Sequence, residues 1–146
     1  MAVMTDRIDR LYLVSCVGKK GIRPVPAKDL YLSTWFKLAR AWVEREAAPW
    51  FILSAKHGVV HPDAVIAPYD ETLNDMPVAG RRDWSERVKS ELVESLPNGG
   101  EIVIFAGRRY REFIDKPLRR HFTSVEVPME GLRIGEQLRW LKNGPR

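Results

Sequence analysis

The side chains in this sequence that can take part in chemistry gather just after short apolar runs. Cys16 follows the run Leu11–Ser15, and Lys56 and His57 follow the run Trp50–Ser54. A thiolate can act as a nucleophile, while an ammonium or imidazolium group can protonate a departing atom. Nearby cations would favour the thiolate, although a lone cysteine more commonly only fills space in a core. These three residues are our first candidates for catalysis.

A second group of polar residues lies in a long connection, residues 61–77, which contains several prolines. Tyr69, Asp70 and Glu71 stand together there. A carboxylate could activate water as a general base or stabilise a cationic sugar, and Tyr69 could stack on a base. The alternative is that this acidic pair only caps a helix. We take Glu71 as a catalytic candidate and Asp70 and Tyr69 as substrate-binding candidates.

The remaining binding candidates follow from where ligands bind in open α/β sheets, outside the carboxyl ends of the strands. Residues at or near the ends of the apolar runs would meet at that edge, and we expect them to contact the substrate: Ser15, Lys19, Tyr31, Ser54, Gly107 and Tyr110. Arginines after the third apolar run either contact phosphates or form a solvated helix face. They are Arg108, Arg109, Arg111, Arg119 and Arg120.

Composition and motifs exclude several classes of protein. The 146 residues contain no Walker loop, no dinucleotide-binding glycine pattern and no paired-cysteine zinc motif, so we expect neither a cofactor nor a metal. Residues 13–16 match a lipoprotein cleavage site, but charged residues occupy positions 6, 7, 9 and 10, where an export signal is apolar. No stretch is apolar for long enough to span a bilayer.

Charge and cysteine usage indicate where the protein works. Its single cysteine rules out an intramolecular disulfide and favours a reducing compartment, so we expect a cytoplasmic protein. Lys and Arg number 24 against 19 Asp and Glu, a net charge of +5. This excess favours a polyanion such as nucleic acid without establishing it as a partner.

The pattern of apolar residues predicts a single α/β domain over residues 1–146. Four strands are expected, at Leu11–Cys16, Trp50–Ser54, Ile102–Ala106 and, more weakly, Ser124–Pro128. Residues 19–28 should form an exposed loop. Helices are expected from Asp29 to about Ala48, over Arg82–Leu96, after Gly107 with a break near Pro117, and around Ile134–Leu141. Alternating strands and helices predict a four-stranded, mostly parallel sheet with helices on both faces.

Six motifs spread along the chain resemble those of a family of small bacterial and phage proteins of unknown function. The motifs are Ser15–Lys20, Ala27–Tyr31, Leu53–Val59, Tyr69–Leu73, Ala106–Tyr110 and Gly131–Leu138. That family looks distantly related to the YaaA proteins, to DpdC-like proteins of 7-deazaguanine DNA modification and to uracil-DNA-glycosylase-like folds. The Gly-x-Asp-Pro-Tyr and His-Pro-Ser-Pro motifs of uracil-DNA glycosylases are missing from the sequence.

The resemblance implies chemistry on a nucleobase, in DNA or in a nucleoside, with two mechanisms open. In nitrile hydration, which we rank slightly first, Cys16 would attack a nitrile carbon and water activated by Glu71 would release the amide. In glycosidic cleavage, Glu71 or Asp70 would position water at the anomeric carbon while Lys56 or His57 stabilises the departing base. A third possibility is a non-catalytic DNA-binding or stress-response module. The oligomeric state stays open.

Overall fold

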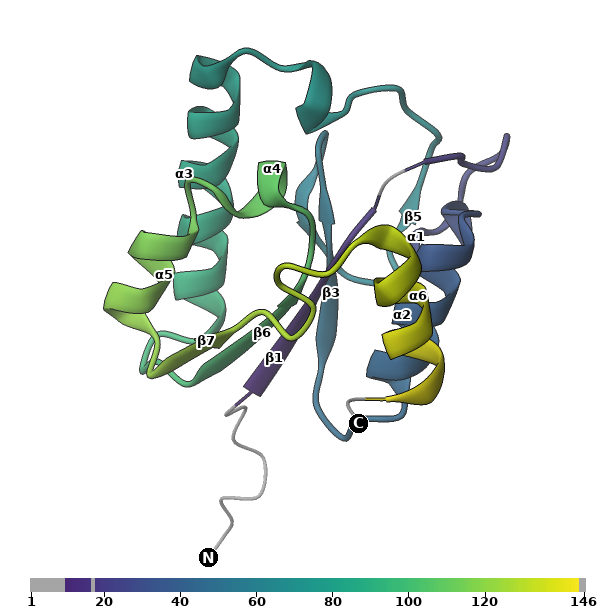
Figure 1. Ribbon diagram of the computed structural model, residues 1–146. Helices are drawn as coiled ribbons and strands as arrows, with labels where there is room; N and C mark the ends of the chain where they lie inside the picture. The colour runs from purple at the N-terminus through teal and green to yellow at the C-terminus, as the bar shows by residue number, and fades with distance from the viewer. Residues whose placement is uncertain (1–9, 17, 145–146) are drawn as a thin grey trace, which may run out of the picture.

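The first predicted strand forms the centre of the sheet in the computed structural model, which describes residues 10–16 and 18–144. β1 (Arg10–Ser15) pairs in parallel with β3 (Trp50–Ser54) on one side and with β6 (Glu101–Phe105) on the other. β7 (Ser124–Glu126) extends the sheet in parallel beyond β6. The strand order is β4-β3-β1-β6-β7 (Figure 1). The predicted α/β class with a mostly parallel sheet is therefore confirmed.

The sheet has five strands within the described residues, one more than the sequence predicts. The extra strand is β4 (Gly58–Val60), which runs antiparallel to β3 after the three-residue turn 55–57. A strand of three residues is too short to show alternation in the sequence. Residues 19–28 and 61–77 also contain more structure than expected, because β2 (Val25–Pro26) pairs with β5 (Val65–Ile66) in a small antiparallel ribbon.

The long helix expected from Asp29 to Ala48 is two helices, α1 (Ala27–Leu30) and α2 (Thr34–Glu44). The chain is extended at Ser33, and the Ser33 hydroxyl accepts a hydrogen bond of 3.1 Å from the backbone N–H of Phe36. Serine in this position is a strong N-cap because it satisfies an N–H group that the first turn leaves unpaired. The capping serine therefore starts a new helix inside an otherwise continuous aromatic pattern.

The other helices lie close to their predicted places. α3 (Val78–Ser95) starts four residues before the predicted Arg82, directly after Pro77. A break does occur after Gly107, between α4 (Arg108–Arg111) and α5 (Asp115–His121), but it precedes Pro117, which sits in the first turn of α5, where proline is tolerated. A short 3₁₀ turn, η2 (Leu73–Asp75), and the final helix α6 (Ile134–Asn143) complete the chain.

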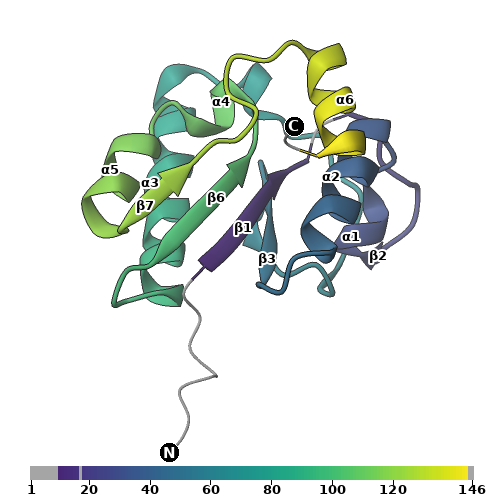
Figure 2. The same cartoon turned by 60° about the horizontal axis from the view of Figure 1, so that its bottom comes forward.

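Alternation along β1 divides the core into two parts. Tyr12 and Val14 pack into a cluster with residues of α2 and α6, whereas Leu11 and Leu13 pack with residues of α3 and α5. Figure 2 shows α2 and α6 on one side of the sheet and α3 and α5 on the other. The predicted placement of helices on both faces is confirmed. Within residues 10–16 and 18–144, none of the helices combines the length and the apolar character that a membrane crossing requires.

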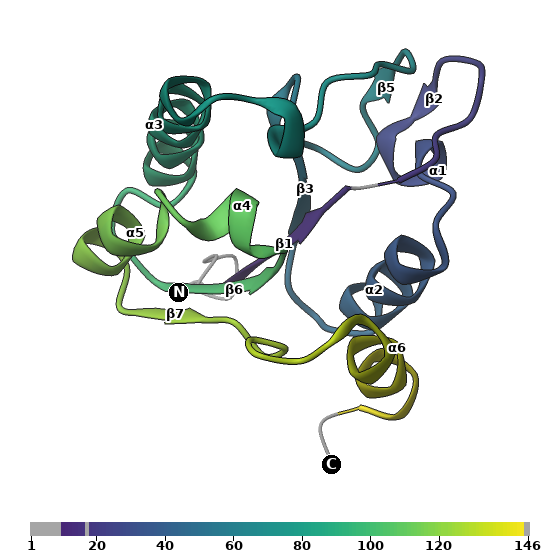
Figure 3. The same cartoon turned by 45° about the horizontal axis from the view of Figure 1, so that its top comes forward.

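The connections leave the two central strands in opposite directions. The chain runs from β1 through α1 and α2 to β3, but from β6 through α4 and α5 to β7, on the other side of β1 (Figure 3). This reversal opens a crevice at the carboxyl ends of the strands, where α/β proteins bind their ligands. The topology therefore predicts a ligand site among the loops after β1, β3 and β6.

Candidate functional site

A cluster of buried polar side chains, here called the tyrosine hub, lies at the carboxyl ends of β1 and β3. It consists of Cys16, Tyr31, Ser54 and Tyr69. The sheet register pairs Ser15 with Leu53, so Cys16 and Ser54, one residue further along each strand, are neighbours. Both are buried, and both tyrosines close over them from other segments. Four of the predicted site residues therefore do meet.

The hydroxyl of Tyr69 is the centre of the tyrosine hub. It accepts a hydrogen bond of 2.8 Å from Ser54 Oγ, and it lies 2.7 Å from the hydroxyl of Tyr31 and 3.3 Å from the sulfur of Cys16. The Cys16 thiol donates to the carbonyl oxygen of Leu53 at 3.1 Å. The donor and acceptor roles can be assigned so that each hydroxyl and thiol proton makes one hydrogen bond: Tyr31 donates to Tyr69, Tyr69 donates to Cys16, and Cys16 donates to Leu53. This assignment requires Cys16 to keep its proton.

Burial acts in the same direction on the ionisable groups of the tyrosine hub. It is the largest cause that raises the pKa of the Cys16 thiol above its ordinary value. It likewise raises the pKa of the Tyr31 and Tyr69 hydroxyls, because a charge in this interior would lose its hydration. The thiol and both phenols are therefore neutral near pH 7. These contacts favour a packing role for Cys16 over a nucleophilic one.

A pocket of about 430 Å³ opens above the tyrosine hub, and we call it the β1-end pocket. Lys20 Nζ lies over the ring of Tyr69, 4.6 Å from its centre, a distance typical of a cation–π contact. Asp70 and Glu71 are exposed. The pocket thus combines cations, carboxylates and an aromatic ring, and its lining residues are Cys16, Gly18, Lys19, Lys20, Gly21, Pro68, Tyr69, Asp70, Glu71 and Thr72.

The two predicted catalytic residues after β3 have different surroundings. The backbone N–H of His57 donates to Ser54 Oγ at 3.0 Å, and its ring meets the Tyr69 ring edge-on, with 5.5 Å between centres. Partial burial, followed by the charges of Lys56 and Arg87, lowers the pKa of His57, so the imidazole is neutral at pH 7. Lys56 is exposed and does not line the β1-end pocket. Lys19 and Lys20, of which Lys20 was not predicted, supply the cations there.

Gly58 has a structural reason to be glycine. Its φ of +76° is one that other residues rarely adopt. A Cβ atom there would lie 2.6 Å from Glu91 Oε1 of α3, whose carboxylate accepts a hydrogen bond of 3.0 Å from the N–H of Val59. The glycine after His57 therefore allows the hairpin of β3 and β4 to pack against α3.

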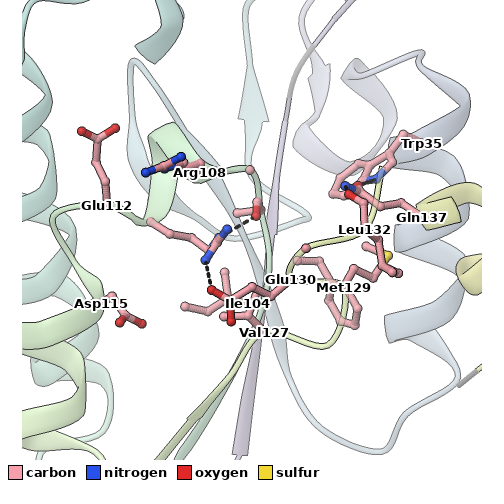
Figure 4. Close-up of a pocket in the computed structure, with 15 residues that line it drawn as sticks. Trp35, Ile104, Arg108, Glu112, Asp115, Val127, Met129, Glu130, Leu132 and Gln137 are labelled. Carbon is pink, nitrogen blue, oxygen red and sulfur yellow. Dashed lines mark hydrogen bonds and ion pairs between the residues drawn. The ribbon is translucent and has the colours of Figure 1, made fainter. Parts of the chain in front are cut away.

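A larger pocket of about 690 Å³, the β6-end pocket, includes one predicted binding residue, Gly107, in its lining. Figure 4 shows Arg108, Glu112 and Asp115 on one side of it and Trp35, Leu132 and Gln137 on the other. Trp35 Nε1 donates to Gln137 Oε1 at 2.8 Å, which joins α2 to α6. In the sequence, this pocket is signalled by Gly107 and by the arginines that follow it, of which Arg108 and Arg111 line it.

The predicted arginines after Gly107 differ in their surroundings. Arg111 lines the β6-end pocket, where it donates to the carbonyl of Ala106 at 3.0 Å and lies 3.3 Å from Glu130. Arg119 is paired with Asp115 of its own helix at 3.1 Å. Arg111 and Arg119 are therefore held by protein groups.

Three predicted binding residues lie beside a further pocket of about 470 Å³ between β1 and β6: Ser15, Gly107 and Tyr110. The Tyr110 hydroxyl also donates to the backbone carbonyl of Cys16 at 3.3 Å, which ties this pocket to the tyrosine hub. Gly107 also lines the β6-end pocket, so the predicted residues that line pockets are divided among all three. Among residues 10–16 and 18–144, no group of three or more His, Cys, Asp or Glu side chains could hold a metal ion.

The fold and these pockets define a small α/β protein with its candidate sites at the carboxyl ends of a mostly parallel sheet. Residues 11–143 match the model described as "Family of unknown function (DUF6884)", and the chain belongs to this family. It is also similar to "Uncharacterized protein YfjM" of Bacillus subtilis (strain 168), with 30% identity over 126 residues, covering 77% of this chain and 79% of that protein. No solved structure matches the chain.

Proposed function

We propose that the protein is a nucleobase-directed enzyme that hydrolyses an N-glycosidic bond in the β1-end pocket. One observation carries the proposal: two lysines and two carboxylates from separate segments line a single pocket above the buried ring of Tyr69. Its volume of about 430 Å³ falls in the range of small-molecule sites, roughly 300 to 1,000 Å³. An aromatic ring beside charged groups suits a planar, polar ligand such as a base.

The chemistry needs only groups that line this pocket. Glu71 accepts a proton from water as the water oxygen bonds to the anomeric carbon of the sugar. The bond between that carbon and the base nitrogen breaks, and its electron pair leaves with the base. Lys19 or Lys20 stabilises the departing base, which then takes up a proton. Asp70 is placed to help hold the sugar or the water.

DNA is the proposed carrier of the base. The net charge of +5 favours a polyanion, and a modified base is proposed from the expected distant relation of the family to proteins of 7-deazaguanine DNA modification. The free, buried thiol suits the reducing cytoplasm, where this activity would operate.

Nitrile hydration at the same pocket is the second candidate, because Cys16 is among the lining residues. That route needs the Cys16 thiolate, whereas its hydrogen bonds and its raised pKa keep it protonated. Glycosidic cleavage leaves the thiol unchanged. For this reason we place glycosidic cleavage first.

The test is mass spectrometry of oligonucleotides that carry guanine, uracil or 7-cyano-7-deazaguanine, after incubation with the wild-type protein. Glu71→Gln, Cys16→Ser and Glu94→Gln are compared, the last being a matched control because Glu94 is exposed on α3 and lines none of these pockets. We expect free base and an abasic strand from the wild type, Cys16→Ser and Glu94→Gln, and at least a hundredfold loss with Glu71→Gln.

Two results would overturn this proposal. Addition of one water to the base that disappears in Cys16→Ser would establish the hydratase in its place. Salt-dependent DNA binding without any change to the base, unaffected by Glu71→Gln, would replace both enzymes with a binding module.

A further inference from the structure

The loop beside the β1-end pocket presents an unusually exposed apolar side chain. Ile22 is 90% exposed, against 66% for Val65 and 50% for Val78. The preceding residue, Gly21, lines the pocket. A side chain of this size is normally buried, because its exposure forgoes the hydrophobic stabilisation of the fold. Single exposed apolar side chains are common on protein surfaces, so the informative feature of Ile22 is its position beside a candidate site.

The backbone that carries Ile22 is held in place. The N–H of Gly21 donates to the carbonyl of Leu30 at 2.9 Å, and the N–H of Leu32 donates to the carbonyl of Lys19 at 2.9 Å. These contacts form an antiparallel bridge between Lys20 and Tyr31, so the loop is tied to a member of the tyrosine hub. The position of Ile22 relative to the pocket is therefore fixed by the same residues that build the pocket.

Cationic residues stand on both sides of Ile22 in the sequence. Lys19 and Lys20 precede it and Arg23 follows it, and none of the three forms an ion pair within the part of the chain that the structure describes. A partner that combines anionic groups with an apolar surface would match these side chains. A protein interface usually covers roughly 800 Å² on each partner, far more apolar surface than one isoleucine supplies. Duplex DNA offers phosphates on both sides of a stack of bases.

We propose that Ile22 is a wedge that enters the base stack of duplex DNA while the target base occupies the β1-end pocket. An enzyme that acts on a base within a duplex must take that base out of the stack. Apolar side chains inserted between base steps unstack and kink the duplex, and cations beside them hold the phosphates. This inference rests on the proposed function for the identity of the base site, and it adds duplex DNA as the substrate.

The test measures unstacking and binding separately from base release. A duplex carries the fluorescent base 2-aminopurine next to the target base, and the same target strand is also used alone. Wild type, Ile22→Ala and Val78→Ala are compared; Val78 is a suitable control because it is exposed on α3 and lines none of the pockets described. We expect the wild type and Val78→Ala to raise the fluorescence of the duplex. Ile22→Ala should abolish this rise and weaken duplex binding roughly tenfold, with single-strand binding unchanged.

The outcomes separate this inference from the proposed function. A fluorescence rise that depends on Ile22, without base release, supports the wedge and removes the glycosidase. Base release from duplex and single strands that is unaffected by Ile22→Ala overturns the wedge and leaves the glycosidase standing. Equal weakening of duplex and single-strand binding by Ile22→Ala also overturns the wedge, because a wedge acts only on stacked bases.

Discussion

Removal of a single hydroxyl from the tyrosine hub tests how its hydrogen bonds are shared. Tyr69→Phe and Tyr31→Phe delete the same atom from two buried tyrosine rings whose hydroxyls are 2.7 Å apart. Without its hydroxyl, Tyr69 no longer accepts from Ser54 or Tyr31 and no longer donates to Cys16. Without its hydroxyl, Tyr31 gives up one donated hydrogen bond, and every other hub donor keeps its acceptor.

The magnitudes follow from this count. A buried donor left without an acceptor costs about 1–3 kcal/mol, and Tyr69→Phe leaves two such donors, at Ser54 and Tyr31. We therefore expect Tyr69→Phe to lower the free energy of unfolding by about 2–6 kcal/mol. Tyr31→Phe removes both the donor and its need for an acceptor, so its cost should stay near 0.5–1.5 kcal/mol, the value of one hydrogen bond.

Urea denaturation followed by tryptophan fluorescence measures both free energies, and an unchanged m value shows that the unfolded states are comparable. Tyr31→Phe serves as the matched control for ring burial. Equal costs for the two variants, or a larger cost for Tyr31→Phe, would refute the central position assigned to the Tyr69 hydroxyl and with it the assignment of the Cys16 proton.

Three further measurements probe the same region. The Cys16 thiol, 3% exposed, should react with a thiol reagent at pH 7 orders of magnitude more slowly in the native protein than in urea, whereas fast native labelling would revive the thiolate mechanism. Gly58→Ala should cost at least 1 kcal/mol more than Gly131→Ala in urea denaturation, because both have positive φ but only Gly58 has atoms within 4 Å of its added Cβ. Burial raises the pKa of Tyr69 in the folded state, so the hydroxyl contributes stability that is fully present below pH 10 and is lost as the pH rises above 10. Above pH 10 the free energy of unfolding should therefore fall with pH less steeply in Tyr69→Phe than in the wild type, by about 1.4 kcal/mol per pH unit.

Sequence patterns predicted the parts of the fold that bury continuous apolar runs. β1, β3 and β6 are each buried along most of their length, and such runs are recognisable without knowledge of their neighbours. β4 escaped prediction because its existence depends on the glycine turn at Gly58 and on packing against α3. The break between α1 and α2 escaped because the aromatic spacing from Tyr31 to Trp42 continues across it.

The residue types of the candidate site could be predicted from the sequence, but not which of these residues contact one another. The rule of strand ends brought Cys16 and Ser54 together correctly, because both end parallel strands in matching register. Tyr69, 53 residues from Cys16, was predicted in the same site, but the sequence could not show that its hydroxyl contacts the Cys16 sulfur, since that contact depends on the path of residues 61–77. It also favoured Lys56 over Lys20, because the direction of a side chain in a three-residue turn depends on the turn geometry.

The tyrosine hub links the two parts of the proposed substrate site. Ser54 receives the backbone N–H of His57 and donates to Tyr69, so the hairpin after β3 and the segment that carries Asp70 and Glu71 are held by one hydroxyl group. Tyr31, the other end of this chain of hydrogen bonds, is bridged to the loop that carries Ile22. Neutral, fully hydrogen-bonded groups fix these segments, and the charged groups that would contact a substrate stay at the surface. In this arrangement Cys16 has a packing role, and the proposed reaction would depend on the carboxylates and lysines around it.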